Sequence, residues 1–178
     1  NMNPTMTCPA TVSVNTDAGV CTESSVALGT PVTADNCSVA SVTNNAPTTF
    51  PLGATTVTWT VTDGSGNTAT CTQIVTVSDI IDPTITCPAA VSVNTDAGVC
   101  TASSVALGTP VTADNCSVAS VTNNAPTTFP LGATTVTWTF TNGPGNTATY
   151  TQLITVAENI ETKNNNQNAG PTPENPQT

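Results

Sequence analysis

The chain has 178 residues with eleven carboxylates, no histidine and one basic residue, Lys163, so its net charge is -10 at pH 7. Nucleic acid requires a basic face that displaces counterions, and an anionic membrane surface requires clustered Lys or Arg, so neither partner is expected. No apolar run approaches the ~20 residues of a membrane span, which predicts no membrane insertion. The amino end has no signal-peptide pattern, so we expect a processed mature form or a piece of a longer chain.

Apolar residues alternate with threonine along the chain, which is typical of half-buried β-strands. In the clearest segment, Val57, Trp59 and Val61 share one face while threonines occupy the other. No segment has a helical period. Short strands separated by Gly, Pro, Asn and Asp predict a β-sandwich. In chain order, the expected strands of the first half are 11–15, 21–28, 38–44, 55–63 and 68–77.

The second half of the chain repeats the first. Residues 8–77 align with 87–156 at a constant offset of 79 positions, and eight of the 70 aligned positions differ. Each repeat is near the lower size limit for a self-sufficient core, so covalent staples are expected. We therefore predict two tandem sandwich domains at 1–79 and 80–157, followed by an Asn- and Pro-rich, low-complexity tail or linker at 158–178.

The first repeat contains four cysteines. Because the chain has no histidine and no C-x-x-C pair, disulfides are favoured over zinc. Of the three possible pairings, strand order favours Cys8 with Cys71, which joins the opening segment to the last strand. The second bond would then be Cys21 with Cys37, joining two middle segments.

The second repeat contains three cysteines, because Tyr150 replaces the fourth. The same logic pairs Cys100 with Cys116 and leaves Cys87 unpaired. Disulfides persist in oxidising compartments, so we expect an extracellular protein, secreted or at the cell surface.

The first repeat contains four motifs in order: Pro-Thr-x-Thr-Cys-Pro at 4–9, Ala-Asp-Asn-Cys at 34–37, Phe-Pro-Leu-Gly-Ala-Thr-Thr-Val-Thr-Trp at 50–59 and Asp-Gly-Ser-Gly-Asn-Thr-Ala-Thr-Cys at 63–71. This order closely resembles the hyalin repeat, or HYR, family.

The resemblance covers residues 3–77 and 82–156. It implies an all-β chain of two tandem immunoglobulin-like β-sandwich domains, of the kind used as building units in extracellular adhesion and surface proteins, including long bacterial ones. It implies no activity, since a fold does not specify a function. The second repeat departs from the family pattern at Tyr150, where the final cysteine is absent.

Catalysis is not expected. Without histidine or arginine, and with its single lysine in the tail, the chain offers a nucleophile no base except an isolated carboxylate. We predict that the protein is not an enzyme and has no cofactor.

Two acidic segments are candidate calcium sites. The loop at 63–67 is better explained as a hairpin turn, because its second copy has Asn142 in place of Asp63 and keeps the glycines. The linker carboxylates Asp79 and Asp82 suit calcium better, but no third carboxylate lies near them, so no metal is assigned.

Two tryptophans and two asparagines are candidate glycan sites. Trp59 and Trp138 share the parity of buried valines, which places them in the core rather than on a sugar-binding surface. Asn36 and Asn115 fit the N-x-[ST] acceptor pattern of a glycoprotein, although the cysteine at the middle position makes both sites weak.

The tail has no hydrophobic period, so its composition predicts a linker or a disordered end that becomes ordered only against a neighbouring subunit. Lys163 and the segment 175–178 resemble a lysine acceptor and a sortase-type signal, respectively, and four residues are a weak match. Internal isopeptide bonds are excluded because neither repeat contains a lysine.

Six of the eight differences between the repeats lie in the last two strands and their turn. One explanation is local repacking, with Phe140 and Tyr150 pointing inward around the unpaired Cys87. The other is that this hairpin contacts a partner, with an opened sandwich edge accepting the terminal segment of the next subunit. The candidate assembly interface is Phe140, Asn142, Pro144, Tyr150, Leu153 and Ile154.

The predicted function is a structural subunit of an extracellular filament or surface fibre, assembling end to end through terminal-segment or edge-strand contacts. The expected partner is the protein itself, with neighbouring repeats or surface glycans as further candidates. The short linker with Pro83 predicts two domains in line with limited bending. The alternative is a pair of spacer modules in a large tandem-repeat adhesin.

Overall fold

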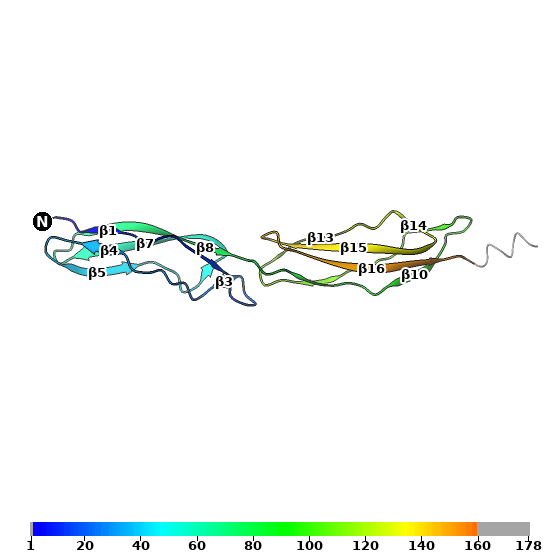
Figure 1. The fold of residues 1–178 in the computed structure, drawn as a ribbon, viewed down its shortest axis with the longest axis horizontal. Helices are drawn as coiled ribbons and strands as arrows, with labels where there is room; N and C mark the ends of the chain where they lie inside the picture. Colours follow the sequence, from blue (N-terminus) through cyan, green and yellow to red (C-terminus); the bar gives the residue numbers. More distant parts are fainter. Residues whose placement is uncertain (1, 160–178) are drawn as a thin grey trace, which may run out of the picture. The chain divides into compact units, whose positions relative to one another are not determined.

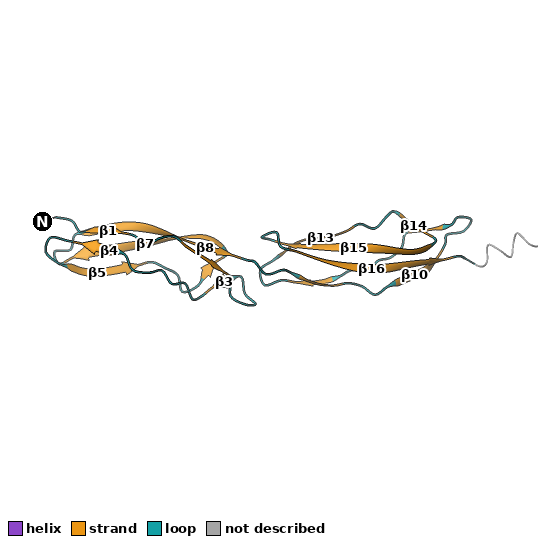
Figure 2. Cartoon of the chain, viewed as in Figure 1, coloured by secondary structure: helices purple, strands orange, loops and turns teal. Residues whose placement is uncertain are grey.

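The structure, a computed structural model, describes residues 2–159 (Figure 1). These residues form strands joined by turns and loops, with no helix among them (Figure 2). In this part of the chain no helix is therefore long and apolar enough to cross a membrane. The chain divides into two compact units: unit 1 is Asn1–Asp82, Asp114–Ser117 and Asn142–Asn146, and unit 2 is Pro83–Ala113, Val118–Thr141 and Thr147–Thr178.

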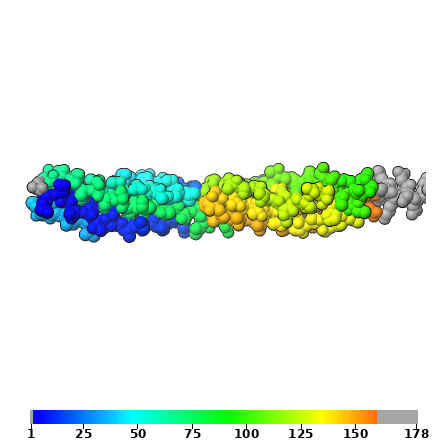
Figure 3. Space-filling view, turned by 90° about the horizontal axis from the view of Figure 1, so that it is seen from above, coloured from blue at the N-terminus to red at the C-terminus, as the bar shows by residue number. Residues whose placement is uncertain are grey.

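The first repeat has a four-stranded sheet in the order β2-β8-β7-β5 and two short pairs, β1-β4 and β3-β6. Strand β2 runs parallel to β8, so the opening segment lies beside the last strand, as blue and green atoms show in Figure 3. The strands are β1 (Thr5–Thr7), β2 (Val12–Asn15), β3 (Thr22–Glu23), β4 (Val32–Ala34), β5 (Val39–Asn44), β6 (Phe50–Pro51), β7 (Gly53–Asp63) and β8 (Thr68–Ser78).

The second repeat has the same topology, with a sheet ordered β10-β16-β15-β13 and the pairs β9-β12 and β11-β14. The two sequence repeats therefore form two tandem immunoglobulin-like all-β domains, as predicted. The strands are β9 (Thr84–Thr86), β10 (Val91–Asn94), β11 (Thr101–Ser103), β12 (Val111–Ala113), β13 (Val118–Asn123), β14 (Thr128–Pro130), β15 (Gly132–Asn142) and β16 (Thr147–Ala157).

The core of the first repeat lies between the four-stranded sheet and the short strands. Val57, Trp59 and Val61 are 0%, 6% and 0% exposed, so the predicted alternation is confirmed. Side chains from the short strands and loops, including Met6 and Leu28, pack against this face. Burial of these apolar faces from water stabilises the sandwich.

In each core one buried glutamine side chain forms hydrogen bonds that connect the tryptophan to two loops. The indole Nε1 of Trp59 donates to Gln73 Oε1 at 3.0 Å, and Gln73 Nε2 donates to the carbonyl oxygens of Ala10 and Leu28 at 2.7 and 2.9 Å. In the second repeat Trp138 and Gln152 make the equivalent bonds. Trp59 and Trp138 therefore lie in the core, as predicted, with their polar atoms paired.

The predicted strand at 21–28 is wrong for most of its length, since only Thr22–Glu23 is extended and paired. Beyond it, Ser24 N donates to Asp17 Oδ2 and Ser25 N donates to Glu23 Oε1. Side-chain carboxylates thus take the backbone donors that a strand would use for its ladder. Val26 and Leu28 still pack on the core.

Candidate functional site

Each repeat contains one loop that holds a cysteine next to an asparagine. In the Asp114–Ser117 loop, Asp114 Oδ2 accepts from Cys116 N at 3.0 Å and Ser117 N at 3.1 Å, an Asx turn that fixes the loop. The Asp35–Ser38 loop of the first repeat has the same turn, with distances of 2.9 and 3.0 Å. Both loops therefore hold an Asn-Cys pair in one local conformation.

The structure contains two disulfides. Cys8 bonds to Cys71, as expected, with 5.8 Å between their Cα atoms. Cys21 bonds to Cys116, with 4.5 Å between Cα atoms. This second bond joins the first sequence repeat to the second, and both cysteines belong to unit 1.

The predicted Cys21–Cys37 bond is wrong, because the two residues lie near opposite ends of β7. At the Asp63 end, Gly64 N donates to Ser38 O. At the other end, where Gly53 pairs with Val77, the bonds from Thr16 N to Ser78 O and from Asp17 N to Thr22 O place the Cys21 loop. Eleven strand residues span about 35 Å, whereas a disulfide needs Cα atoms within about 7 Å.

The predicted Cys100–Cys116 bond is wrong for the same reason. Leu131 N donates to Cys100 O just before β15 begins, and Gly143 N donates to Ser117 O just after it ends. Cys116 is bonded to Cys21 instead. Within the described residues the free cysteines are Cys37 and Cys100, both exposed, and the half-buried Cys87.

Next to the Cys21–Cys116 bond, the amide of Asn115 binds the first repeat. Its Nδ2 contacts Thr16 Oγ1 at 3.2 Å, the Val20 carbonyl oxygen at 3.1 Å and Asp79 Oδ1 at 3.3 Å. Nδ2 also lies 3.6 Å from Cys116 Sγ. The Asn-Cys pair therefore docks through one covalent bond and a set of shared hydrogen bonds.

The linker carboxylate Asp79 is at the centre of this arrangement and is 5% exposed. Its Oδ1 also accepts from Ile81 N at 3.0 Å, and its Oδ2 accepts from Asn142 Nδ2 at 3.1 Å. Hydrogen-bond donors thus occupy both oxygens of the Asp79 carboxylate, to which the sequence analysis assigned no metal. Among the described residues no group of three His, Cys, Asp or Glu side chains could hold a metal ion.

The turn of the second repeat completes the site. Asn142 Nδ2 also reaches Ile81 O at 3.3 Å and Asp114 Oδ1 at 3.4 Å, while Asn146 Nδ2 donates to Asp79 O at 3.0 Å. We call this set the cysteine junction; it comprises Thr16, Val20, Cys21, Asp79, Ile81, Asp114, Asn115, Cys116, Asn142 and Asn146.

The equivalent turn of the first repeat closes on itself. Asp63 Oδ1 accepts from Ser65 N and Asn67 N, both at 2.8 Å, and Asp63 Oδ2 accepts from Asn67 Nδ2 at 2.7 Å. These bonds, led by that from the Asn67 side chain, lower the pKa of Asp63 below its ordinary value. The loop at 63–67 is therefore a turn, as predicted.

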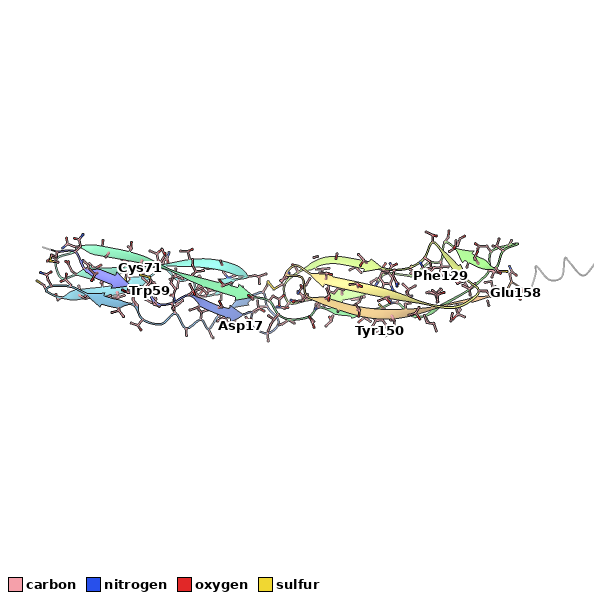
Figure 4. The ribbon with its side chains drawn as sticks, turned by 45° about the horizontal axis from the view of Figure 1, so that its top comes forward. Asp17, Trp59, Cys71, Phe129, Tyr150 and Glu158 are labelled. Carbon is pink, nitrogen blue, oxygen red and sulfur yellow. A yellow bond between two sulfur atoms is a disulfide. The ribbon has the colours of Figure 1, made fainter. Side chains whose placement is uncertain are left out.

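The six residues of the candidate assembly interface have different environments. Phe140 and Ile154 are 0% exposed, so they cannot form a contact surface and that part of the prediction is wrong. Tyr150, labelled in Figure 4, is 52% exposed, so its predicted inward packing is also wrong. Leu153 is exposed and therefore available for a contact. Asn142 belongs to the cysteine junction and Pro144 lines a cavity of unit 1 with Leu52.

The remaining predicted sites are the two glycosylation candidates and the tail segments. Asn36 is exposed, so its side chain is accessible to glycosylation. The Nδ2 atom of Asn115, to which a glycan would be attached, instead donates hydrogen bonds within the cysteine junction. Lys163 and the tail segments beyond residue 159, including 175–178, lie outside the described residues.

Sequence reasoning missed the core role of Gln73 and the docking role of Asn115, which it considered only as a glycan acceptor. Gln73 shares the parity of the buried Val75 and Val77, which was a readable signal for a polar group needing partners inside the core. Asn115 had no such signal, because its partners Thr16 and Val20 lie 99 and 95 positions away.

A family model described as HYR domain matches residues 1–77 and 78–156. The chain belongs to the HYR domain family. HYR domains are adhesion-type modules, and two of them in tandem with two disulfides indicate an extracellular or surface location.

Comparison with curated proteins gave no match. Among solved structures, extracellular cadherin domains 1–4 of protocadherin gamma B7 are similar with a TM-score of 0.39 and 10% sequence identity. The match covers 88% of this chain and 51% of the other, so this HYR chain spans about half of that structure.

Proposed function

We propose that this HYR protein is a structural subunit of an extracellular fibre whose repeats are joined end to end. The observation that carries the proposal is the Cys21–Cys116 bond, which adds a covalent link to the peptide linker where one repeat follows the next. A load applied along the chain is then shared between the linker and the disulfide. Such a junction suits a load-bearing element better than a site that opens for a ligand.

Hydrogen bonding at the junction supports the same role. The Asp79 carboxylate accepts from three residues and is almost fully buried. Separating the parts of the junction would remove the donors Asn115 and Asn142 and leave its Oδ2 unpaired. Leaving a buried charged group without partners is costly, which favours a fixed arrangement over a hinge.

Electron microscopy of the purified chain under oxidising conditions tests the proposal. Filaments longer than a single chain are the expected result. Particles that remain single chains at all concentrations would contradict it.

A spacer role in a longer adhesin is the second candidate, and one observation favours it. The linker residues Asp79 and Ile81 are themselves part of the junction, so the same arrangement can recur wherever one polypeptide continues through successive repeats. Denaturing electrophoresis of reduced native material separates the two: units of one chain length support the fibre, and one much longer polypeptide supports the spacer.

A further inference from the structure

Two exposed cysteines occupy positions whose counterparts are bonded. Cys100 aligns with Cys21 and Cys37 aligns with Cys116, and those counterparts form the disulfide of the cysteine junction. Cys37 and Cys100 are both free and exposed. An exposed pair of thiols in an extracellular protein indicates either intermolecular pairing or a reactive site.

Cys100 lines a cavity of about 260 Å³ in unit 2, together with Thr95, Gly98, Val99, Leu131 and Glu158. Glu158 follows β16 and lies at the same end of unit 2 as Phe129 (Figure 4). The counterparts of Thr95, Val99 and Glu158 are Thr16, Val20 and Asp79, whose oxygens accept from Asn115 Nδ2. The cavity therefore repeats a receptor that, in unit 1, holds an Asn-Cys pair.

A second Asn-Cys pair is available in the same chain. Asn36 and Cys37 are held by the Asx turn of Asp35, as Asn115 and Cys116 are held by that of Asp114. Both Asn36 and Cys37 are exposed. Within the described residues Asp35 Oδ1 is buried without a hydrogen-bond partner, whereas its counterpart Asp114 Oδ1 accepts from Asn142.

We propose that the Cys100 cavity of one copy receives the Asp35–Ser38 loop of a second copy, and that a Cys37–Cys100 disulfide locks the contact. This inference rests on the proposed function and specifies its joint. The contact is heterologous, because each copy presents one receptor and one loop, and repetition of such contacts yields an open chain of subunits.

The chemistry is thiol–disulfide exchange with a small-molecule disulfide such as oxidised glutathione. The Cys100 thiolate attacks one glutathione sulfur, forms a mixed disulfide and releases one glutathione thiolate. The Cys37 thiolate of the second copy then attacks the Cys100 sulfur and releases the other. The two cysteine sulfurs lose two electrons, the reagent gains them, and the thiol protons go to the two released glutathiones.

Charge limits this joint in one respect. In the cysteine junction Asn142 donates to Asp79. The aligned residues in the proposed joint are Asp63 of the copy that supplies the loop and Glu158 of the copy that supplies the cavity. Two carboxylates facing each other repel, so non-covalent docking is weak and the disulfide holds the joint. Replacing Asp63 by Asn should therefore speed coupling.

The test mixes two full-length variants, Cys37→Ser and Cys100→Ser, in oxidised glutathione. Each variant can supply only one half of the joint, so the expected product is a mixed dimer, while the wild-type chain forms a ladder on non-reducing gels. Mass spectrometry of a digest from isotopically light and heavy copies should find Cys37–Cys100 peptides joining the two. Asn36→Ala, which removes one hydrogen bond of about 1 kcal/mol, should slow coupling about fivefold.

Cys87→Ser serves as the matched control, because Cys87 is half-buried and should leave the ladder unchanged. Monomers only, or Cys37–Cys37 and Cys100–Cys100 dimers in yields equal to the mixed dimer, would overturn the proposal. Filaments of normal abundance from a Cys37→Ser/Cys100→Ser double variant would overturn it and leave the fibre function standing. A disulfide ladder without filaments would support this joint and contradict the fibre.

Discussion

The turns at 63–67 and 142–146 share one backbone arrangement and differ in what they bind. In both, one side-chain oxygen of the first residue, Asp63 or Asn142, accepts from two backbone amides of the same turn. The other atom is a carboxylate oxygen in Asp63, which accepts from Asn67, and an amide nitrogen in Asn142, which donates to the linker. One Asp-to-Asn difference thus converts a self-contained turn into a docking surface.

The repeats also stabilise themselves differently. The first has the Cys8–Cys71 bond, whereas in the second Cys87 is free and packs against a core that includes Ile154 in place of Val75. Phe140, which is also fully buried, stands in place of Val61. Added apolar volume inside the second core accounts for these two differences. The strand-addition hypothesis for the same region stays a prediction.

The largest expected difference between the repeats follows from removing Cys8–Cys71. A Cys8→Ala/Cys71→Ala variant loses a bond that closes 63 residues, so the free energy of unfolding of the first repeat should fall by about 4 kcal/mol. Hydrogen exchange of β8 and β16 peptides in increasing urea measures the two repeats separately. Cys87→Ala is the control in the second repeat and should cost far less; equal losses would contradict the assignment.

The next largest effect should be the same in both repeats, which tests whether their cores are equivalent. Gln73→Ala removes the acceptor of Trp59 Nε1 and the donors to two carbonyl oxygens, and Gln152→Ala does the same for Trp138. Buried groups left unpaired should reduce the free energy of unfolding by about 3 kcal/mol in each case. Urea titrations followed by tryptophan fluorescence check this, and a twofold difference between the variants would show that the cores are not equivalent.

Exchanging the distinguishing residue of the turns should have a smaller, local effect. Asn142→Asp keeps the turn acceptor but places a carboxylate against Asp79 and Asp114, so the free energy of opening the cysteine junction should fall by about 2 kcal/mol. Dithiothreitol should then reduce Cys21–Cys116 on the order of 30-fold faster. The Cys8–Cys71 bond is the internal control, and equal acceleration of both bonds would indicate general destabilisation instead.

Sequence alone predicted the fold well, because alternation and repetition are local signals. The parity of Val57, Trp59 and Val61 fixed the buried face, and the positions of Cys8 and Cys71 in the opening segment and last strand gave their pairing. The predicted partner of Cys21 was wrong because it was chosen from the order of segments along the chain. That order does not show at which end of a long strand each loop lies. Counting the length of the 55–63 strand would have separated Cys21 from Cys37.

The cysteine junction could not be predicted from the sequence, for a different reason. The long-range hydrogen bonds of Asn115 and Asn142 connect residues from 28 to 99 positions apart. In the sequence, an asparagine in a turn motif is the same whether its amide faces solvent or another part of the protein. The Asp63/Asn142 difference was visible in the sequence and led to the hypothesis that only the second hairpin contacts a partner subunit, which stays a prediction. The contact that the structure shows for it is with the linker, within unit 1.

The smallest expected effect is a pH response confined to the first turn. Because hydrogen bonds from Asn67 lower the pKa of Asp63 below 3.8, its ionised form stabilises the turn above that value, and this contribution is lost as the pH falls through the lowered pKa. The amide resonances of Ser65 and Asn67, which donate to Asp63, should shift with a midpoint below pH 3.8, while those of Gly145 and Asn146, which donate to the amide of Asn142, should not titrate.

Asp17 and Asp96 provide the matched control for that titration, because bonds from Ser24 and Ser103 lower the pKa of the two carboxyls in the same way in both repeats. The amides of Ser24 and Ser103 should therefore titrate in parallel, so an asymmetry between the turns at 63–67 and 142–146 reports the Asp-to-Asn difference and no general acid effect. In an Asp63→Asn variant the Ser65 and Asn67 titration should disappear while that of Ser24 remains. If instead Gly145 and Asn146 titrated with the same midpoint as Ser65 and Asn67, the pH response would arise from opening of the whole sandwich, and the contrast drawn between the two turns would fail.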